Sequence, residues 1–184
     1  EIERERLQEF SYSSTISKEL LGEIIHKKKL LDLGAGANTE LGKWIAERGG
    51  KFAALDIHEP FLVEQKNAGL SAVRGRVERP PFLPESVDIT HMRFVLLHLQ
   101  PEARRQAIKE AVQLASERSF FLEVDWTTFE GESLINQFRD FSLAALGKRS
   151  DFYMGRKLKE EVESALAGKK VEIRERRFHR DRGA

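Results

Sequence analysis

Short apolar runs alternate along the chain with longer segments in which apolar residues recur at helical spacing. A short apolar run bounded by turn residues is typical of a strand that is covered on both faces of its sheet. Strands that alternate with helices indicate a parallel sheet with helices on both sides. We therefore expect a three-layer α/β/α fold with a doubly wound, mostly parallel sheet. The runs that we expect to form strands are 30–33, 52–55, 70–74, 87–92 and 120–124.

The segments between these runs carry helix signals. After the first run, Leu41, Trp44 and Ile45 give an apolar helix face, Asn38 is a favourable N-cap, and Gly49 supplies a left-handed stop. Three prolines within 77–84 predict a loop. The further elements that we expect are one or two helices within 1–26, helices beginning at 60 and 101, helices over 132–146 and 156–166, and an edge strand over 171–178.

The composition excludes several classes of protein. The chain has 184 residues, which is enough for one domain with a sizeable core. It contains no cysteine, which excludes disulfide bonds, thiolate metal sites and a cysteine nucleophile. Its five histidines show no paired spacing, so we expect no metal site. No run approaches the roughly 20 apolar residues that cross a bilayer, so we expect a cytoplasmic protein without a membrane partner.

The charges are nearly balanced. The 31 basic and 30 acidic residues leave a net charge of +1, which provides no global field to attract nucleic acid. Two segments, 26–29 and 174–182, are locally basic, but acidic residues interrupt the second. This mixture favours a solvated edge strand over a phosphate-binding face. Nucleic acid is therefore not the expected partner.

The first apolar run leads into the most informative stretch, residues 30–38. Gly34 and Gly36 let the backbone turn tightly and approach a ligand, because neither residue has a Cβ. Asp56 ends the second run about 20 residues further on, where an acidic side chain can bind both hydroxyl groups of a ribose. Asp32 precedes the first glycine closely, and a carboxylate there would repel a pyrophosphate. The pattern favours a nucleoside with a cationic head.

With these motifs the sequence resembles the class I methyltransferases that depend on S-adenosylmethionine (SAM). Residues 32–38 match the first motif of that family, and Asp56 matches the second. Residues 87–99 are similar to its fourth strand and the following turn, and 151–158 are similar to a segment found in a small-molecule-modifying subgroup. The resemblance covers most of the chain and implies SAM as the cofactor. It implies in-line transfer of the methyl group of SAM to an oxygen, nitrogen or carbon atom of a small-molecule acceptor, with the protein holding donor and acceptor in line.

The resemblance also divides the single expected domain, 1–184. The family normally closes its sheet with a further antiparallel strand, and the chain ends too early for one, so we expect that strand to be missing. The expected parts are an N-terminal helical cap over 1–26, a cofactor-binding core over 27–126, a segment that covers the substrate over 127–157, and the last helix with an edge strand over 158–184.

Candidate site residues lie at or near the carboxyl ends of the expected strands, where such folds bind ligands. Asp32 is expected either to hold the ammonium group of SAM, directly or through water, or to pin the turn by accepting backbone N–H groups. Arg76 stands where the family often has an acidic residue that faces adenine, and Asn38 stands where it often has a third glycine. The candidate cofactor-binding residues are Asp32, Gly34, Ala35, Gly36, Asn38, Asp56, Ile57, Arg76, Val77, Met92 and Arg93. The candidate catalytic bases are His91 and Asp125, and the candidate substrate-binding residues are Tyr12, Trp126, Tyr153 and Arg156.

Three other functions stay open. Arg76 and Asn38 raise the alternative of a SAM-binding protein without transferase activity. Tyr153 and Lys157 have the spacing of short-chain dehydrogenases, which raises an NAD-dependent oxidoreductase, although Asp32 counts against that class. The basic tail alone raises RNA methylation. The sequence does not decide between a monomer and a homodimer.

Overall fold

The structure, a computed structural model, describes residues 13–22, 24–123, 150–151 and 153–169. Within these residues a sheet of five parallel strands has the order β3-β2-β1-β4-β5. The strands are β1 (Lys29–Leu33), β2 (Lys51–Asp56), β3 (Ser71–Arg74), β4 (Val87–Arg93) and β5 (Ala115–Leu122). The helices are α2 (Ser13–Leu21), α3 (Glu40–Glu47), α4 (Glu59–Asn67), α5 (Pro101–Leu114) and α7 (Met154–Ala165), with a short 3-10 helix, η1 (Leu96–His98).

The direction in which strands are added to the sheet reverses at β1. From β1 the chain proceeds outward through β2 to β3, and it then returns to place β4 on the other side of β1. Such a reversal leaves a crevice beyond the carboxyl ends of the central strands, where folds of this kind bind ligands. The doubly wound parallel sheet predicted from the sequence is therefore confirmed, and β1, β2 and β4 end side by side at the edge where such folds bind ligands.

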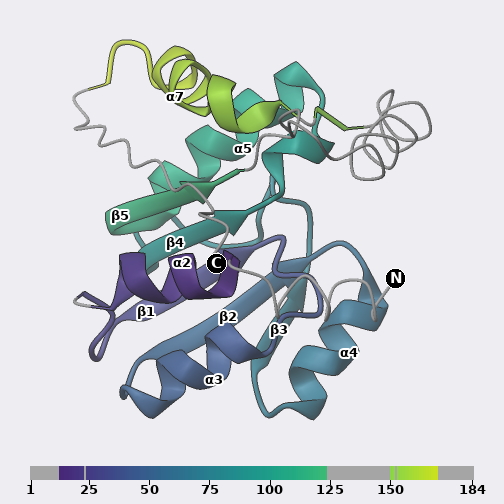
Figure 1. The fold of residues 1–184 in the computed structure, drawn as a ribbon, viewed down its shortest axis with the longest axis vertical. Helices are drawn as coiled ribbons and strands as arrows, with labels where there is room; N and C mark the ends of the chain where they lie inside the picture. The colour runs from purple at the N-terminus through teal and green to yellow at the C-terminus, as the bar shows by residue number, and fades with distance from the viewer. Residues whose placement is uncertain (1–12, 23, 124–149, 152, 170–184) are drawn as a thin grey trace, which may run out of the picture.

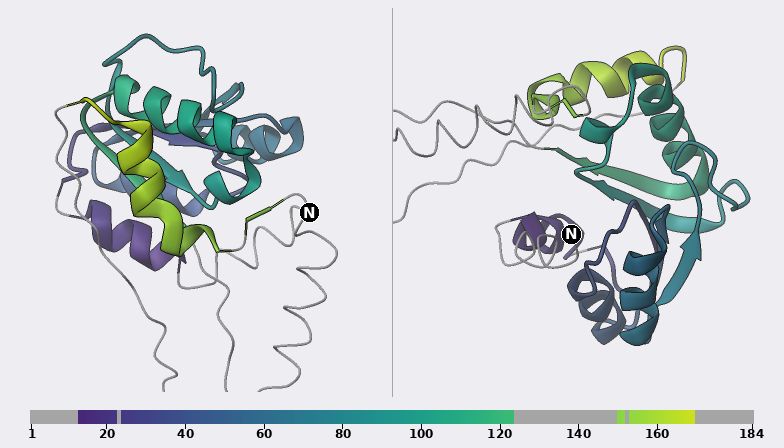
Figure 2. Two further views of the ribbon diagram at one scale, coloured as in Figure 1. Left: turned by 90° about the horizontal axis from the view of Figure 1, so that it is seen from above. Right: turned by 90° about the vertical axis from the view of Figure 1, so that its right-hand side faces the viewer.

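Helices cover both faces of the sheet. Alternate residues of each strand point to opposite faces, so the apolar strands present apolar side chains on both sides. On one face, Leu30 of β1 packs in a cluster with Leu21 of α2 and Leu41 of α3. On the other face, Leu31 packs in a cluster with Ile108 of α5 and with residues of α7. Figure 1 shows α5 beside β5 with α7 next to α5, and α3 and α4 beside β2 and β3; Figure 2 gives two further views of the same layers.

Two elements begin at least two residues earlier than the sequence predicts. β5 begins at Ala115, five residues before the predicted apolar run, because residues 115–119 pair with β4 although they are mostly polar. Backbone pairing along β4 thus overrides the weak strand signal of this stretch. α7 begins at Met154, two residues before the predicted helix, and Gly168 follows it at a φ of 83°.

Several predicted elements lie outside the described residues, namely the helix over 132–146, the strand over 171–178 and any helix within 1–12. Of the predicted N-terminal helices, α2 is described. Among the helices that the structure describes, none has the length and apolar character needed to cross a membrane.

Candidate functional site

The loop between β1 and α3 uses its own N–H groups inside the protein. The N–H groups of Gly34 and Ala35 both donate to the carbonyl oxygen of Leu55, at 2.7 and 3.1 Å. The N–H of Gly36 donates to Oδ2 of Asp56 at 2.9 Å. Gly34 and Gly36 have φ values of 75° and 62°, which side chains with a Cβ rarely adopt. Three successive loop N–H groups are therefore engaged, whereas a loop that cradles phosphate presents such groups to its ligand.

Asp56, at the end of β2, is a fixed and largely buried carboxylate. Its Oδ2 accepts the N–H of Gly36, and its Oδ1 accepts the N–H of His58 at 2.8 Å. The residue is 6% exposed. Oδ1 also lies 3.3 Å from the ring atom Nδ1 of His58, whose side chain is 59% exposed. Each carboxylate oxygen has two lone pairs, so Oδ2 keeps one further accepting direction, and the remaining direction of Oδ1 is shared with the His58 ring. Ile57, the next residue, leaves 42% of its surface exposed.

Gln65 of α4 holds the same loop from the other side. Its Nε2 donates to the carbonyl oxygens of Gly36 and Asn38, at 3.1 and 2.8 Å. Asn38 is also buried, and its Oδ1 accepts the N–H of Leu41 at 3.2 Å, which satisfies one of the free N–H groups at the start of α3. The Nδ2 of Asn38 and the Oε1 of Gln65 are buried without a hydrogen-bond partner. Sequence reasoning missed Gln65, because a glutamine on a helix gives no signal of burial.

A buried chain of three polar side chains joins β1, β4 and α2. Asp32 Oδ1 lies 2.8 Å from His91 Nδ1, and His91 Nε2 lies 3.1 Å from Ser17 Oγ. The strand register places Asp32 directly opposite His91. A carboxylate only accepts hydrogen bonds, so Nδ1 of His91 carries the hydrogen in this pair. Although the order of groups is that of a Ser-His-Asp triad, the hydroxyl of Ser17 is not open to a substrate, because Ser17 is 0% exposed.

The other predicted cofactor-binding residues lie around this edge. Met92 points to the opposite face from His91 and is packed in the core at 1% exposure. The guanidinium carbon of Arg93 lies 6.0 Å from the ring centroid of Phe94. Arg76 pairs with Glu78 at 2.9 Å and is exposed, whereas Val77 is buried. Contacts of these residues with a cofactor stay predictions.

Glu123 follows β5 on the other half of the same edge. Its Oε1 accepts the N–H groups of Val95 and Leu96, at 3.0 and 2.7 Å, at the start of η1. Its Oε2 is buried without a hydrogen-bond partner. Burial raises the pKa of the Glu123 carboxyl to about 8, although those backbone hydrogen bonds and the nearby Arg104 act to lower it. Sequence reasoning did not single out Glu123, because its partners lie 27 and 28 positions away in the chain.

The raised pKa predicts that Glu123→Gln makes the fold more stable than the wild type at alkaline pH. The folded carboxyl keeps its proton up to about pH 8, whereas an unfolded one releases it above its usual value of 4.5, so the free energy of unfolding falls as the pH rises between these values. The slope is up to about 1.4 kcal/mol per pH unit. Urea unfolding at pH 5 and pH 8.5 measures the effect. Exposed Glu163→Gln on α7 is the control, and an unchanged pH dependence in Glu123→Gln would contradict the assignment.

The predicted substrate-binding residues are only partly described. The guanidinium carbon of Arg156 lies 4.8 Å from the ring centroid of Tyr153, at the start of α7. Lys157, which a dehydrogenase would need close to the tyrosine hydroxyl, pairs with Asp151 at 2.9 Å. Tyr12, Asp125 and Trp126 lie outside the described residues. The substrate-binding and catalytic roles of all these residues stay predictions.

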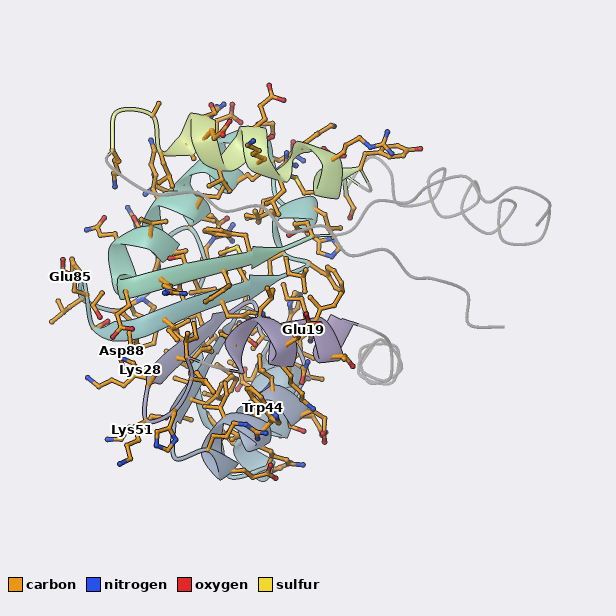
Figure 3. All side chains as sticks on the ribbon, turned by 60° about the vertical axis from the view of Figure 1, so that its left-hand side comes forward. Glu19, Lys28, Trp44, Lys51, Glu85 and Asp88 are labelled. Atoms are coloured by element: carbon orange, nitrogen blue, oxygen red, sulfur yellow. The ribbon has the colours of Figure 1, made fainter. Side chains whose placement is uncertain are left out.

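The opposite edge of the sheet, where the strands begin, carries charges of both signs. Figure 3 shows Lys28, Lys51, Glu85 and Asp88 gathered there. Lys28 donates a hydrogen bond to Glu117, and that bond raises the pKa of the lysine. Because acidic side chains lie among the lysines, this edge is not a uniformly positive surface.

Within the described ranges, no group of three or more histidine or acidic side chains has an arrangement that could hold a metal ion.

Comparison with known proteins identifies the family. A family model described as a methyltransferase domain matches residues 31–122, which is half of the chain. The matched segment begins within β1 and ends with β5, so it contains the glycine loop, Asp56 and the reversal of strand order. The chain therefore belongs to the methyltransferase-domain family, and its predicted place among the class I SAM-dependent methyltransferases is confirmed. A comparison with curated proteins finds no significant match.

Solved structures share the fold at low sequence identity. A methyltransferase of Haloferax volcanii, solved in complex with the methyltransferase activator Trm112, is 14% identical with a TM-score of 0.67, over 89% of this chain and 72% of that one. A SAM-dependent methyltransferase of Thermotoga maritima, for which histamine N-methylation is suggested, is 17% identical with a TM-score of 0.63, over 89% and 75%. A protein of Pyrococcus horikoshii is 19% identical with a TM-score of 0.52, and the match covers 59% of this chain and 55% of that one. At these identities the likeness shows the fold alone.

Proposed function

We propose that this chain binds SAM at the edge formed by β1 and β2 and transfers its methyl group to a small-molecule acceptor. The observation that carries the proposal is the contact between the glycine loop and Asp56, in which the N–H of Gly36 donates to the carboxylate. A loop whose N–H groups are engaged internally, beside a fixed carboxylate, disfavours a phosphate and favours ribose hydroxyl groups and a cationic head.

The residues at this edge fit the parts of SAM. The open accepting direction of Asp56 Oδ2 suits one ribose hydroxyl group, and Oδ1 accepts the second once the exposed ring of His58 turns away. Exposed Ile57 offers an apolar surface next to them for the adenine ring. At Gly34 a Cβ would lie 2.5 Å from the side chain of Val95, so the protein itself needs a glycine there. Gly36, at a φ of 62°, leaves the loop without a side chain beside Asp56. Asn38 stays a candidate at this loop, because its buried amide Nδ2 has no hydrogen-bond partner among the described residues.

When bound, SAM would supply a methyl group that passes in line to a nucleophilic atom of the acceptor, with S-adenosylhomocysteine as the leaving group. The role of this chain is then to orient donor and acceptor, and no protein nucleophile is needed. We place the acceptor toward β4 and β5, because SAM occupies the β1 and β2 half of the edge. Of the predicted bases, His91 has both ring nitrogens within hydrogen-bond distance of protein groups, namely Asp32 and Ser17. We therefore favour a structural role for His91 over a role in proton transfer. A cytoplasmic location and the choice between monomer and homodimer stay predictions.

The same loop geometry counts against the dehydrogenase alternative. A dinucleotide needs loop N–H groups and a helix start open to its pyrophosphate. Here Gly34, Ala35 and Gly36 direct their N–H groups at Leu55 and Asp56. We therefore expect no tight binding of NAD.

Thermal unfolding in the presence of SAM, S-adenosylhomocysteine or NAD tests the proposal. A ligand that binds only the folded state stabilises it by about 2.7 kcal/mol at a hundred times its Kd. We expect both adenosyl compounds, and not NAD, to raise the melting temperature. A rise with NAD alone would overturn the proposal. Binding of SAM without formation of S-adenosylhomocysteine across a broad panel of small acceptors and RNA would instead favour the alternative of a binding protein without transferase activity.

A further inference from the structure

Gln65 is a buried amide that reaches from α4 to the loop after β1. It is 0% exposed, and its Nε2 donates to two carbonyl oxygens that lie 29 and 27 positions earlier in the chain, those of Gly36 and Asn38. Losing this donor would leave two buried carbonyl groups without that partner, which opposes folding of the loop into its present form. The amide therefore fixes the loop conformation from outside the loop.

The same contact bears on the carboxylate of Asp56 through Gly36. The peptide group before Gly36 is held by Asp56, which accepts its N–H at 2.9 Å. The peptide group after Gly36 is held by Gln65, which donates to its carbonyl oxygen at 3.1 Å. Between them the residue has a φ of 62°, which is one of several conformations open to glycine, so the two hydrogen bonds select it. Gln65, Gly36 and Asp56 thus form a continuous chain of hydrogen bonds from α4 to the end of β2.

We propose that Gln65 is a positioning residue for the nucleoside: it fixes Gly36, and through Gly36 it sets the orientation in which Asp56 meets the ribose. The inference rests on the proposed function. It assigns to α4 a part in SAM affinity without any direct contact between α4 and the ligand.

The chemistry of the contact requires a donor at position 65. Leucine has a similar size but donates nothing to the two carbonyl groups. A glutamate of the same shape places a carboxylate oxygen against the carbonyl oxygens of Gly36 and Asn38, which repel it. Once protonated, that glutamate regains an O–H donor for one of the two carbonyl groups. Glutamate at this position should therefore act poorly at high pH and better at low pH, whereas leucine should not recover.

Calorimetric titration with S-adenosylhomocysteine tests the inference. We expect Gln65→Leu to weaken binding about tenfold, and Gln65→Glu to weaken it at pH 8 but to regain part of the affinity at pH 5.5. Gln106→Leu is the matched control, because Gln106 is an exposed residue of α5 at the other side of the sheet. It should bind like the wild type at both pH values. If Gln65→Leu does not fold, the pH dependence of Gln65→Glu decides the question.

A cycle with Asp56→Asn shows whether Gln65 acts through Asp56. If it does, the losses in affinity from the two single substitutions do not add in the double variant. Unchanged affinity in the Gln65 variants, or a lower melting temperature with no loss of affinity, would overturn the positioning role while leaving the proposed function intact. Failure of the wild type to bind S-adenosylhomocysteine would overturn the proposed function itself, and the inference with it.

Discussion

Replacing Asp56 by alanine is expected to weaken SAM binding a hundredfold or more. The carboxylate is held by the N–H groups of Gly36 and His58, so it meets the ribose without further ordering. Hydrogen bonds to a charged group contribute about 1.5–3 kcal/mol each, and losing two of them corresponds to at least about a hundredfold change in Kd. Isothermal titration with SAM measures the change directly.

A second aspartate provides the control for this substitution. Asp88 also accepts a backbone N–H, that of Lys29 at 2.7 Å, but it lies at the edge where the strands begin. Asp88→Ala should therefore lower stability somewhat and leave SAM affinity unchanged. Circular dichroism confirms that each variant is folded before titration. SAM binding by Asp56→Ala that equals that of the wild type would show that the nucleoside is held elsewhere.

Replacing His91 by leucine is expected to lower the free energy of unfolding by about 3–5 kcal/mol, because it leaves the carboxylate of Asp32 buried without its partner. Both side chains are nearly inaccessible, at 1% and 3% exposure, and their strands place them in register. Urea unfolding at neutral pH measures the loss. Ser17→Ala should have a smaller effect, about 1–2 kcal/mol, because it removes one neutral hydrogen bond.

The double variant Asp32→Asn with His91→Leu separates a structural pair from a catalytic base. Because asparagine carries no charge, the double variant should be more stable than His91→Leu alone. A catalytic base would behave differently: His91→Leu would keep its stability and lose methyl transfer. That result would contradict the structural role that we favour for His91 and would restore the role of base predicted from the sequence.

Much of the fold was readable from the sequence, because its signals are local. The apolar runs predicted β1, β2, β3 and β4 within a few residues, since each run is short and bounded by turn residues. Gly34 and Gly36 were singled out for a tight turn, and both have positive φ values in the structure. Asp56 was predicted to end its strand at the ligand-binding edge, and it does so. Its contact with ribose stays a prediction.

The partners of the site residues were not readable, because they depend on pairing across the fold. Nothing in the local sequence of α4 marks Gln65 as a donor to a loop 27 to 29 positions away. The contact of His91 with Ser17 spans 74 positions and requires α2 to lie over β1 and β4. The start of β5 was placed too late for a similar reason, since the polar residues 115–119 form a strand only because β4 lies beside them.

A crystal structure of the chain with S-adenosylhomocysteine would test the central claim most directly. The account predicts that the ribose hydroxyl groups lie within hydrogen-bond distance of both oxygens of Asp56, with the glycine loop unchanged and the adenine against Ile57. A nucleoside bound away from β1 and β2, or one that makes no contact with Asp56, would contradict it.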